Sequence, residues 1–163
     1  MKKNLSPHPA GFTMIELMVV LAIAAILALM AMPSYYFRVV REQIETITPL
    51  TAVAEAPVAT AWATTQILPA NNAAAGLPVA TKMVGNYVSA VTIQDGAVNV
   101  TFGNRATQAL TGKILTYRPA VVTDSPIVPV AWVCGNASAP KNMTVMGVNQ
   151  TNIAPNYLPN SCK

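Results

Sequence analysis

The chain has 163 residues, of which 53% are hydrophobic and only 10% are charged, and its formal net charge is +4. This length suggests one domain plus an anchor. Two of the positive charges, Lys2 and Lys3, precede the most apolar stretch, and the other basic residues are scattered along the chain. A small, unclustered positive charge does not support nucleic acid as an obligate partner.

The first eleven residues are short, basic and rich in turn formers, and Pro7 and Pro9 exclude a stable helix there. Such a segment before an apolar stretch is also typical of an ordinary secretory signal, which signal peptidase removes. Two features count against that interpretation. The apolar stretch is longer than the usual hydrophobic region of a signal peptide, and a carboxylate, Glu16, lies inside it.

The segment from Gly11 to Pro33 is the most informative part of the chain. Residues 17–32 are apolar without interruption. Together with the mostly apolar residues before them, they give about the length of helix that crosses a bilayer core. A charge such as Glu16 inside this helix costs roughly 2.5–3.5 kcal/mol on insertion scales. We therefore expect Glu16 to have a function, and the function we infer is assembly.

The segment 34–65 keeps the helical period while its polarity rises. Its apolar residues recur mostly three and four positions apart, as on one face of an amphipathic helix, at Val40, Ile44, Ile47, Ala54, Val58 and Ala61. We therefore predict one long helix from about residue 12 to about residue 65. Pro33 is expected to kink or loosen it, and a bend or break is expected near Pro49 or Pro57.

The segment 66–86 is rich in Ala, Asn, Gly and Pro and is predicted to be a connecting loop. The region 87–134 carries strand signals, with a two-residue hairpin turn at Asp95-Gly96 and a third strand that Pro119 should end. Successive hairpins favour an antiparallel sheet with one face on the helix. The predicted strands are 87–94, 97–103, 113–118 and 129–134.

The two cysteines, Cys134 and Cys162, both lie late in the chain. In an exported protein they are expected to form one disulfide, which closes the irregular tail 134–162 into a loop on the last strand. A metal site is not expected, because the only histidine is His8, in the leader, and no Cys-x-x-Cys occurs. No cofactor is expected.

The sequence from Gly11 to Leu17, GFTMIEL, follows a short basic leader and resembles the N-terminal pattern of type IV prepilins. Pro33, the pair Tyr35 and Tyr36, and Arg41 match positions common in these pilins. The order of helix, loop, four-stranded sheet and disulfide-bounded tail extends the resemblance over essentially the whole chain. These pilins usually have a second proline that kinks the helix. This chain has no proline at that position, and Pro49 and Pro57 lie on either side of it.

The resemblance implies an α+β type IV pilin fold. In this fold a long N-terminal helix, half transmembrane and half amphipathic, packs on a four-stranded antiparallel sheet, and a disulfide-bounded loop ends the chain. The resemblance also implies cleavage between Gly11 and Phe12 by the prepilin peptidase, and N-methylation of Phe12. The leader is then 1–11, the transmembrane and polymerisation helix 12–33, and the periplasmic or extracellular globular domain 34–163.

The implied function is that of a structural subunit, not an enzyme. A single-pass precursor would wait in the bacterial inner membrane, and the pilus assembly machinery would build it into a helical surface filament of identical copies. There, Glu16 would pair with the Phe12 amine of a neighbour and so select the stagger between subunits. The filament would serve adhesion, twitching motility or DNA uptake.

Three other functions are compatible with a membrane-anchored chain of this kind: a pseudopilin of type II secretion, a minor DNA-binding pilin and a membrane-anchored enzyme. The disulfide-bounded tail and the lack of an acidic calcium-loop pattern favour the pilus over the pseudopilin. An enzyme is not expected, because the sequence has no Ser/His/Asp set, no phosphate-binding glycine loop and no evident pair of catalytic carboxylates. A DNA-binding pilin would need a basic stripe on its folded surface.

Overall fold

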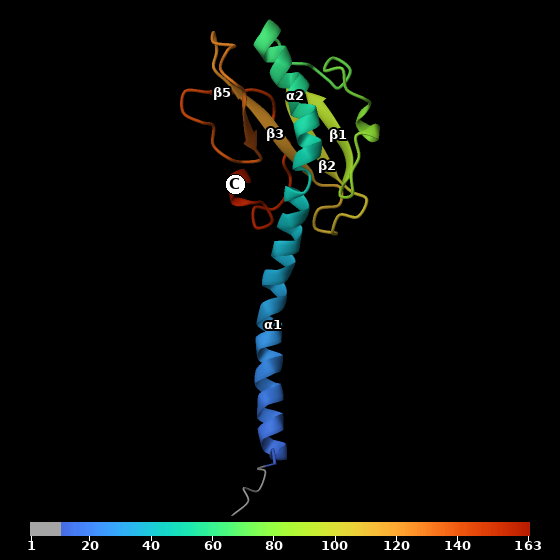
Figure 1. Ribbon diagram of the computed structural model, residues 1–163, viewed down its shortest axis with the longest axis vertical. Helices are drawn as coiled ribbons and strands as arrows, with labels where there is room; N and C mark the ends of the chain where they lie inside the picture. Colours follow the sequence, from blue (N-terminus) through green and yellow to red (C-terminus); the bar gives the residue numbers. More distant parts are fainter. Residues whose placement is uncertain (1–10) are drawn as a thin grey trace, which may run out of the picture. The chain divides into compact units, whose positions relative to one another are not determined.

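The computed structural model describes residues 11–163. The expected leader, residues 1–11, therefore lies outside the described residues except for Gly11. The chain divides into two compact units, Met1–Tyr36 and Phe37–Lys163. The first unit is helical from Met14 onward, and its helix continues into the second unit, which also contains the sheet (Figure 1).

The long helix α1 runs over Met14–Glu45 and continues through Pro33. A turn at Thr46 and Ile47 follows, and α2 then runs over Thr48–Thr65. The break thus falls just before Pro49, where the sequence predicted a bend or break near Pro49 or Pro57. Pro49 lies in the first turn of α2, where its missing N–H costs nothing, because the first N–H groups of a helix have no partner inside the helix.

The sheet is antiparallel, and its strands β1 (Val88–Gln94), β2 (Ala97–Phe102), β3 (Ile114–Val121) and β4 (Ala131–Cys134) lie side by side in that order. Figure 1 labels the first three of them. Residues Asp95 and Gly96 join β1 to β2 with φ of 48° and 82°, as a two-residue turn of type I′ requires. The predicted α+β fold with four antiparallel strands is confirmed, and a short fifth strand, β5, pairs with β3. The strand β5 covers Thr144–Val145.

Two expectations about the sheet were wrong. Pro119 does not end the third strand but lies inside β3, two residues past Tyr117, the last partner of β2. Its ring nitrogen faces the gap between β2 and β5, where β3 forms no ladder hydrogen bond with β2. The missing N–H of proline therefore breaks no such bond, and proline is tolerated at such a place. The tail, expected to be irregular throughout, contributes β5, whose neighbour Met146 donates its N–H to the Pro119 carbonyl at 2.8 Å.

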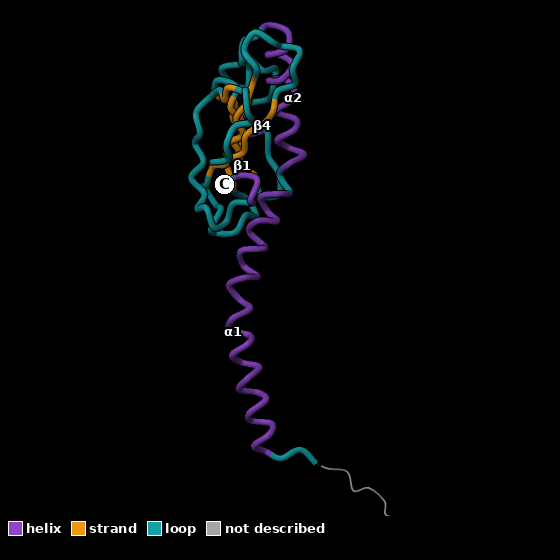
Figure 2. Tube along the Cα trace, turned by 90° about the vertical axis from the view of Figure 1, so that its left-hand side faces the viewer, coloured by secondary structure: helices purple, strands orange, loops and turns teal. Residues whose placement is uncertain are grey.

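One face of the sheet packs on the helices (Figures 1 and 2). The expected apolar stripe is buried at every position except Ala61, which is half-buried, and Thr51 and Trp62 extend it. Helical and sheet side chains together form one core. Its largest fully buried members include Phe102, Ile44, Ile93, Leu110, Leu115, Leu158, Val40 and Val58.

The C-terminal tail covers the other face of the sheet. In the middle of that face, the Thr116 hydroxyl donates to Asn99 Oδ1 at 2.8 Å and accepts the N–H of Gln150 at 3.0 Å. Gly147, with φ of 81°, lies so close to the sheet that a Cβ on it would be 2.8 Å from the Cβ of Ala97. A residue other than glycine would strain the backbone and push the tail off the sheet.

The outer edge of β1 is covered by one side chain of the preceding loop, Asn72. Its Oδ1 accepts the N–H of Ile93 at 2.6 Å, and its Nδ2 donates to the carbonyl oxygens of Val91 at 2.9 Å and Pro78 at 3.0 Å. The carboxamide thus takes the place of a neighbouring strand. This blocks the pairing of an exposed edge with another chain.

Candidate functional site

The first turn of α1 is built by Thr13 and Glu16. The Glu16 N–H donates to Thr13 Oγ1 at 3.3 Å, and the Leu17 N–H donates to the Thr13 carbonyl at 3.2 Å. The sequence Thr-Met-Ile-Glu has the spacing of a capping box, in which threonine caps the helix and glutamate follows at its third position. This arrangement places the Glu16 carboxylate in the first turn of the helix.

The apolar surface of α1 in the unit Met1–Tyr36 is exposed. Each described side chain from Phe12 to Ala31 is exposed, with Phe12 at 81% and Leu17 at 52%. By length and composition, the helical run Met14–Thr65 is long and apolar enough to cross a membrane. No residue of its most apolar part is buried. A contiguous apolar surface of this size marks contact with a membrane or with other proteins.

Glu16 is the only charged residue between Gly11 and Pro33. Among the residues that the structure describes, one ion pair is formed, between Arg38 and Glu42 at 3.0 Å, further along α1. Within the described part of the chain, Glu16 therefore has no cationic partner. A carboxylate that is buried with this apolar surface is strongly destabilising unless it is paired with a positive charge or protonated.

Gly11 has open surroundings, since a Cβ built on it would meet nothing within 4 Å. The described fold therefore leaves room for a side chain at this position.

The disulfide joins Cys134, the last residue of β4, to Cys162 in the short helix η2 (Asn160–Cys162). Gly135, with φ of 54°, lies next to it, and a Cβ there would be 2.6 Å from the Cys162 carbonyl oxygen. That oxygen accepts the N–H of Asn136 at 3.0 Å. The end of the chain is thus attached to the sheet by one covalent bond and one hydrogen bond.

The tail also packs on the last turns of α1. Arg41 Nη2 donates to the Asn156 carbonyl at 3.0 Å, and the rings of Phe37 and Tyr157 lie 5.4 Å apart. Phe37, Arg41, Asn156 and Lys163 line a small pocket there. Arg41, singled out in the sequence for its match to the pilin pattern, therefore positions the tail.

Two ionisable groups between α2 and β3 have shifted pKa values. Burial raises the pKa of the Glu55 carboxyl from its usual 4.5 to about 7. Burial, and then the negative charge of Glu55, raises the pKa of the Tyr117 hydroxyl to about 12. Glu55 is the only charged residue of α2. No group of three or more His, Cys, Asp and Glu that could hold a metal occurs within residues 11–163.

Comparison with known proteins gives the class. A family model described as pilin (bacterial filament) matches residues 43–163, and a model described as the prokaryotic N-terminal methylation motif matches residues 7–32. The chain belongs to the pilin family. This is a family of structural subunits and not of enzymes.

Individual relatives make the class more specific. The chain is 31% identical to a fimbrial protein of Neisseria meningitidis serogroup A, with 94% of this chain and 93% of that protein covered. It is also 31% identical to a type IV major pilin protein PilE1 of Neisseria gonorrhoeae, with 94% and 86% covered. A type IV major fimbrial protein FimA of Dichelobacter nodosus is 32% identical, with 76% and 86% covered. The chain is a structural subunit of a type IV pilus.

Proposed function

We propose that the chain is made as a precursor whose leader, residues 1–11, is cut between Gly11 and Phe12 by a prepilin peptidase, after which Phe12 is N-methylated. The match to the methylation motif over residues 7–32 supports this proposal. So do the surroundings of Gly11: a glycine at a position where the fold leaves room for a side chain fits recognition by another protein.

The processed subunit then rests in the inner membrane as a single-pass protein and moves from there into a surface filament of identical copies. The observation that carries this proposal is the exposed apolar surface of Phe12 and of α1 as far as Met30, interrupted by one carboxylate. Lipid covers that surface before assembly, and the helices of neighbouring subunits cover it afterwards. The segment 12–33 thus serves first as anchor and then as filament core.

Glu16 sets the register of the polymer. Cleavage creates an ammonium group at Phe12, and the Glu16 carboxylate of a neighbouring subunit pairs with it. A buried charge without a partner is strongly destabilising, whereas a paired one is tolerated, so only the stagger that forms the pair is stable. Adhesion, twitching motility or DNA uptake are the activities of the resulting filament.

Mass spectrometry of filaments sheared from the cell surface tests the proposal. The expected subunit begins at Phe12, carries one added methyl group and retains the Cys134–Cys162 disulfide. A subunit that begins after the apolar stretch, near Ala31, would instead indicate an ordinary secretory signal and would contradict the proposed processing. An unprocessed subunit with residues 1–11 attached would contradict it as well.

A further inference from the structure

An isoleucine projects from the connection between β3 and β4. This Ile127 loop, residues 122–130, carries Ile127 at 91% exposure, more than the 81% of Phe12 just before α1. Pro126 and Pro129 flank it, and the Val128 N–H donates to the Ser125 carbonyl at 3.1 Å. Prolines with fixed φ and a closed turn hold the loop stiff, so that little entropy is lost when Ile127 is ordered by a partner.

A second apolar feature lies at the end of α2. This α2 groove is a cavity of about 530 Å³ that carries no charged side chain. Ile67, on its rim, is 71% exposed. Its lining residues are Ala61, Thr64, Thr65, Ile67, Leu68, Pro69, Ala70 and Ala74.

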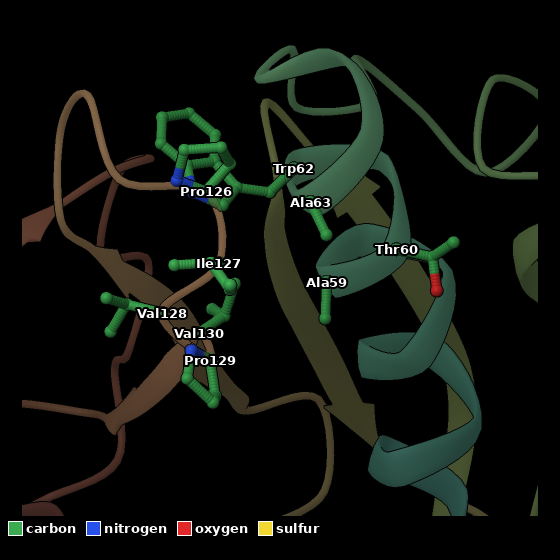
Figure 3. Close-up of a pocket in the computed structure, with 9 residues that line it drawn as sticks. All are labelled: Ala59, Thr60, Trp62, Ala63, Pro126, Ile127, Val128, Pro129 and Val130. Atoms are coloured by element: carbon green, nitrogen blue, oxygen red, sulfur yellow. The ribbon is translucent and has the colours of Figure 1, made fainter.

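The Ile127 loop and the α2 groove lie on opposite flanks of α2. Ala59 and Ala63 of α2 face the Ile127 loop across a smaller pocket (Figure 3). Ala61 and Thr65 line the α2 groove. At 3.6 residues per turn, a shift of two positions turns a side chain by about 200° around the helix axis. One subunit can therefore present Ile127 on one side while it receives a partner on the other.

We propose that Ile127 of one subunit docks in the α2 groove of the next subunit, as a contact between globular domains of the pilus. The proposal rests on the membership of the chain in a family of filament subunits. A contact between two different surfaces of identical copies does not close on itself unless its rotation forms a ring, and it otherwise generates a helical filament. The α2 groove and the segment 125–130 that presents Ile127 carry no charged side chain, so the insertion of Ile127 itself buries no charge. Asp124, the one charged residue of the loop, is exposed and lies three positions before Ile127.

Cross-linking within intact filaments tests the contact. The double variant Ile127→Cys, Ala70→Cys places one new thiol on the loop and one in the groove of the same chain. Cys134 and Cys162 form a buried disulfide, so they should not undergo thiol–disulfide exchange with the new cysteines. Oxidised, sheared filaments should give a ladder of covalent multimers on a non-reducing gel. Each single variant should give at most dimers, and the matched pair Val148→Cys, Ala70→Cys should give no ladder, although Val148 is 64% exposed. Filaments of the first pair that run only as monomers would overturn the proposal.

Substitution by aspartate gives a second test that does not depend on disulfide formation. Ile127→Asp places an unpaired carboxylate in an apolar groove, and because the side chain is exposed in the subunit it leaves the fold intact. Sheared filaments should fall about tenfold relative to Val148→Asp, while the membrane pool of processed subunit persists. Equal filament yields from the two variants would overturn the contact. If the variant subunit is still cut at Gly11 and anchored in the membrane, its loss of filaments is due to the lost contact and not to a failure of the proposed processing.

Discussion

The backbone N–H of Glu16 donates to the Oγ1 of Thr13 at 3.3 Å, which makes Glu16 part of the helix start as well as the only charge of the apolar segment. A capping interaction of this kind and a carboxylate near a helix N-terminus each contribute about 1 kcal/mol. A lone carboxylate in an apolar helix costs roughly 2.5–3.5 kcal/mol. The contribution of the helix N-terminus to the carboxylate is smaller than this cost, which favours the proposed pairing of Glu16 with the Phe12 ammonium of a neighbouring subunit.

Gly11 is expected to act in processing and not in folding. Gly11→Val should leave the precursor uncut, seen as a subunit band that keeps its leader, because the larger side chain blocks the peptidase. The fold should be unchanged, since a Cβ at this position meets nothing within 4 Å. Detection of the normal mature N-terminus in this variant, by sequencing or mass spectrometry, would contradict the assignment.

Gly147 and Gly76 form a matched pair that isolates the packing of the tail on the sheet. Both have positive φ, 81° and 69°, so alanine strains either backbone by about 1 kcal/mol. A Cβ at Gly76 meets nothing within 4 Å, whereas one at Gly147 meets Ala97. Gly147→Ala should therefore lower the free energy of unfolding by about 1–3 kcal/mol more than Gly76→Ala. Thermal unfolding of the full-length protein in detergent measures the difference, and equal losses would show that the tail is not tightly packed there.

Asn72 is expected to stabilise the edge of β1 through its carboxamide. Asn72→Ala leaves a buried N–H of Ile93 and a buried carbonyl of Val91 without partners, which should destabilise the protein by about 2–4 kcal/mol. The control is the adjacent, exposed Asn71, whose side chain accepts only the N–H of Ala74. Denaturant unfolding should separate the two variants, and a loss at Asn71 as large as that at Asn72 would refute the edge role.

Glu55 makes stability depend on pH. Its pKa is about 7 in the folded chain and near 4.5 when unfolded, so the folded state holds the proton more tightly. The stabilisation is complete below about pH 4.5 and is lost as the pH rises through 7. Since the carboxyl is partly exposed, the loss should be on the order of 1–2 kcal/mol. Glu55→Gln should remove this dependence between pH 5 and 8, whereas Glu45→Gln, an exposed control, should keep it. A wild-type melting temperature that does not fall over this range would contradict the assignment.

The parts of the fold with a local cause were predictable from the sequence. The apolar period predicted the stripe from Val40 to Val58, and Asp95-Gly96 predicted the first hairpin. What escaped prediction depends on partners distant in the chain. Pro119 is tolerated in β3 only because β2 has already ended, and Asn72 matters only because β1 lies beside it. Trp62 was missed because steps of three and of four from Val58 reach Ala61 and Trp62 alike, and the predicted stripe followed Ala61.

The candidate site also has a part that the sequence predicts and a part that only the folded structure reveals. Gly11, Phe12 and Glu16 follow from a short contiguous motif, which sequence shows directly. Ile127 and the α2 groove come from segments that meet only after folding, and a single isoleucine between two prolines carries no periodic signal. The inference about Ile127 depends on the exposure of its side chain, which is known only from the folded chain.

The most direct test of the account is the filament yield of Glu16→Ala, with Glu45→Ala as the control at an exposed carboxylate of the same helix. Without the Glu16 carboxylate, the Phe12 ammonium of the neighbouring subunit loses its partner and the pairing that selects the stagger in the helical core is absent. Electron microscopy and immunoblots of sheared surface material should therefore show filaments reduced at least tenfold. The processed subunit should remain in the membrane at its normal level, and Glu45→Ala should assemble normally. Abundant, normal surface filaments from Glu16→Ala would contradict the central claim that this carboxylate sets the register of the polymer.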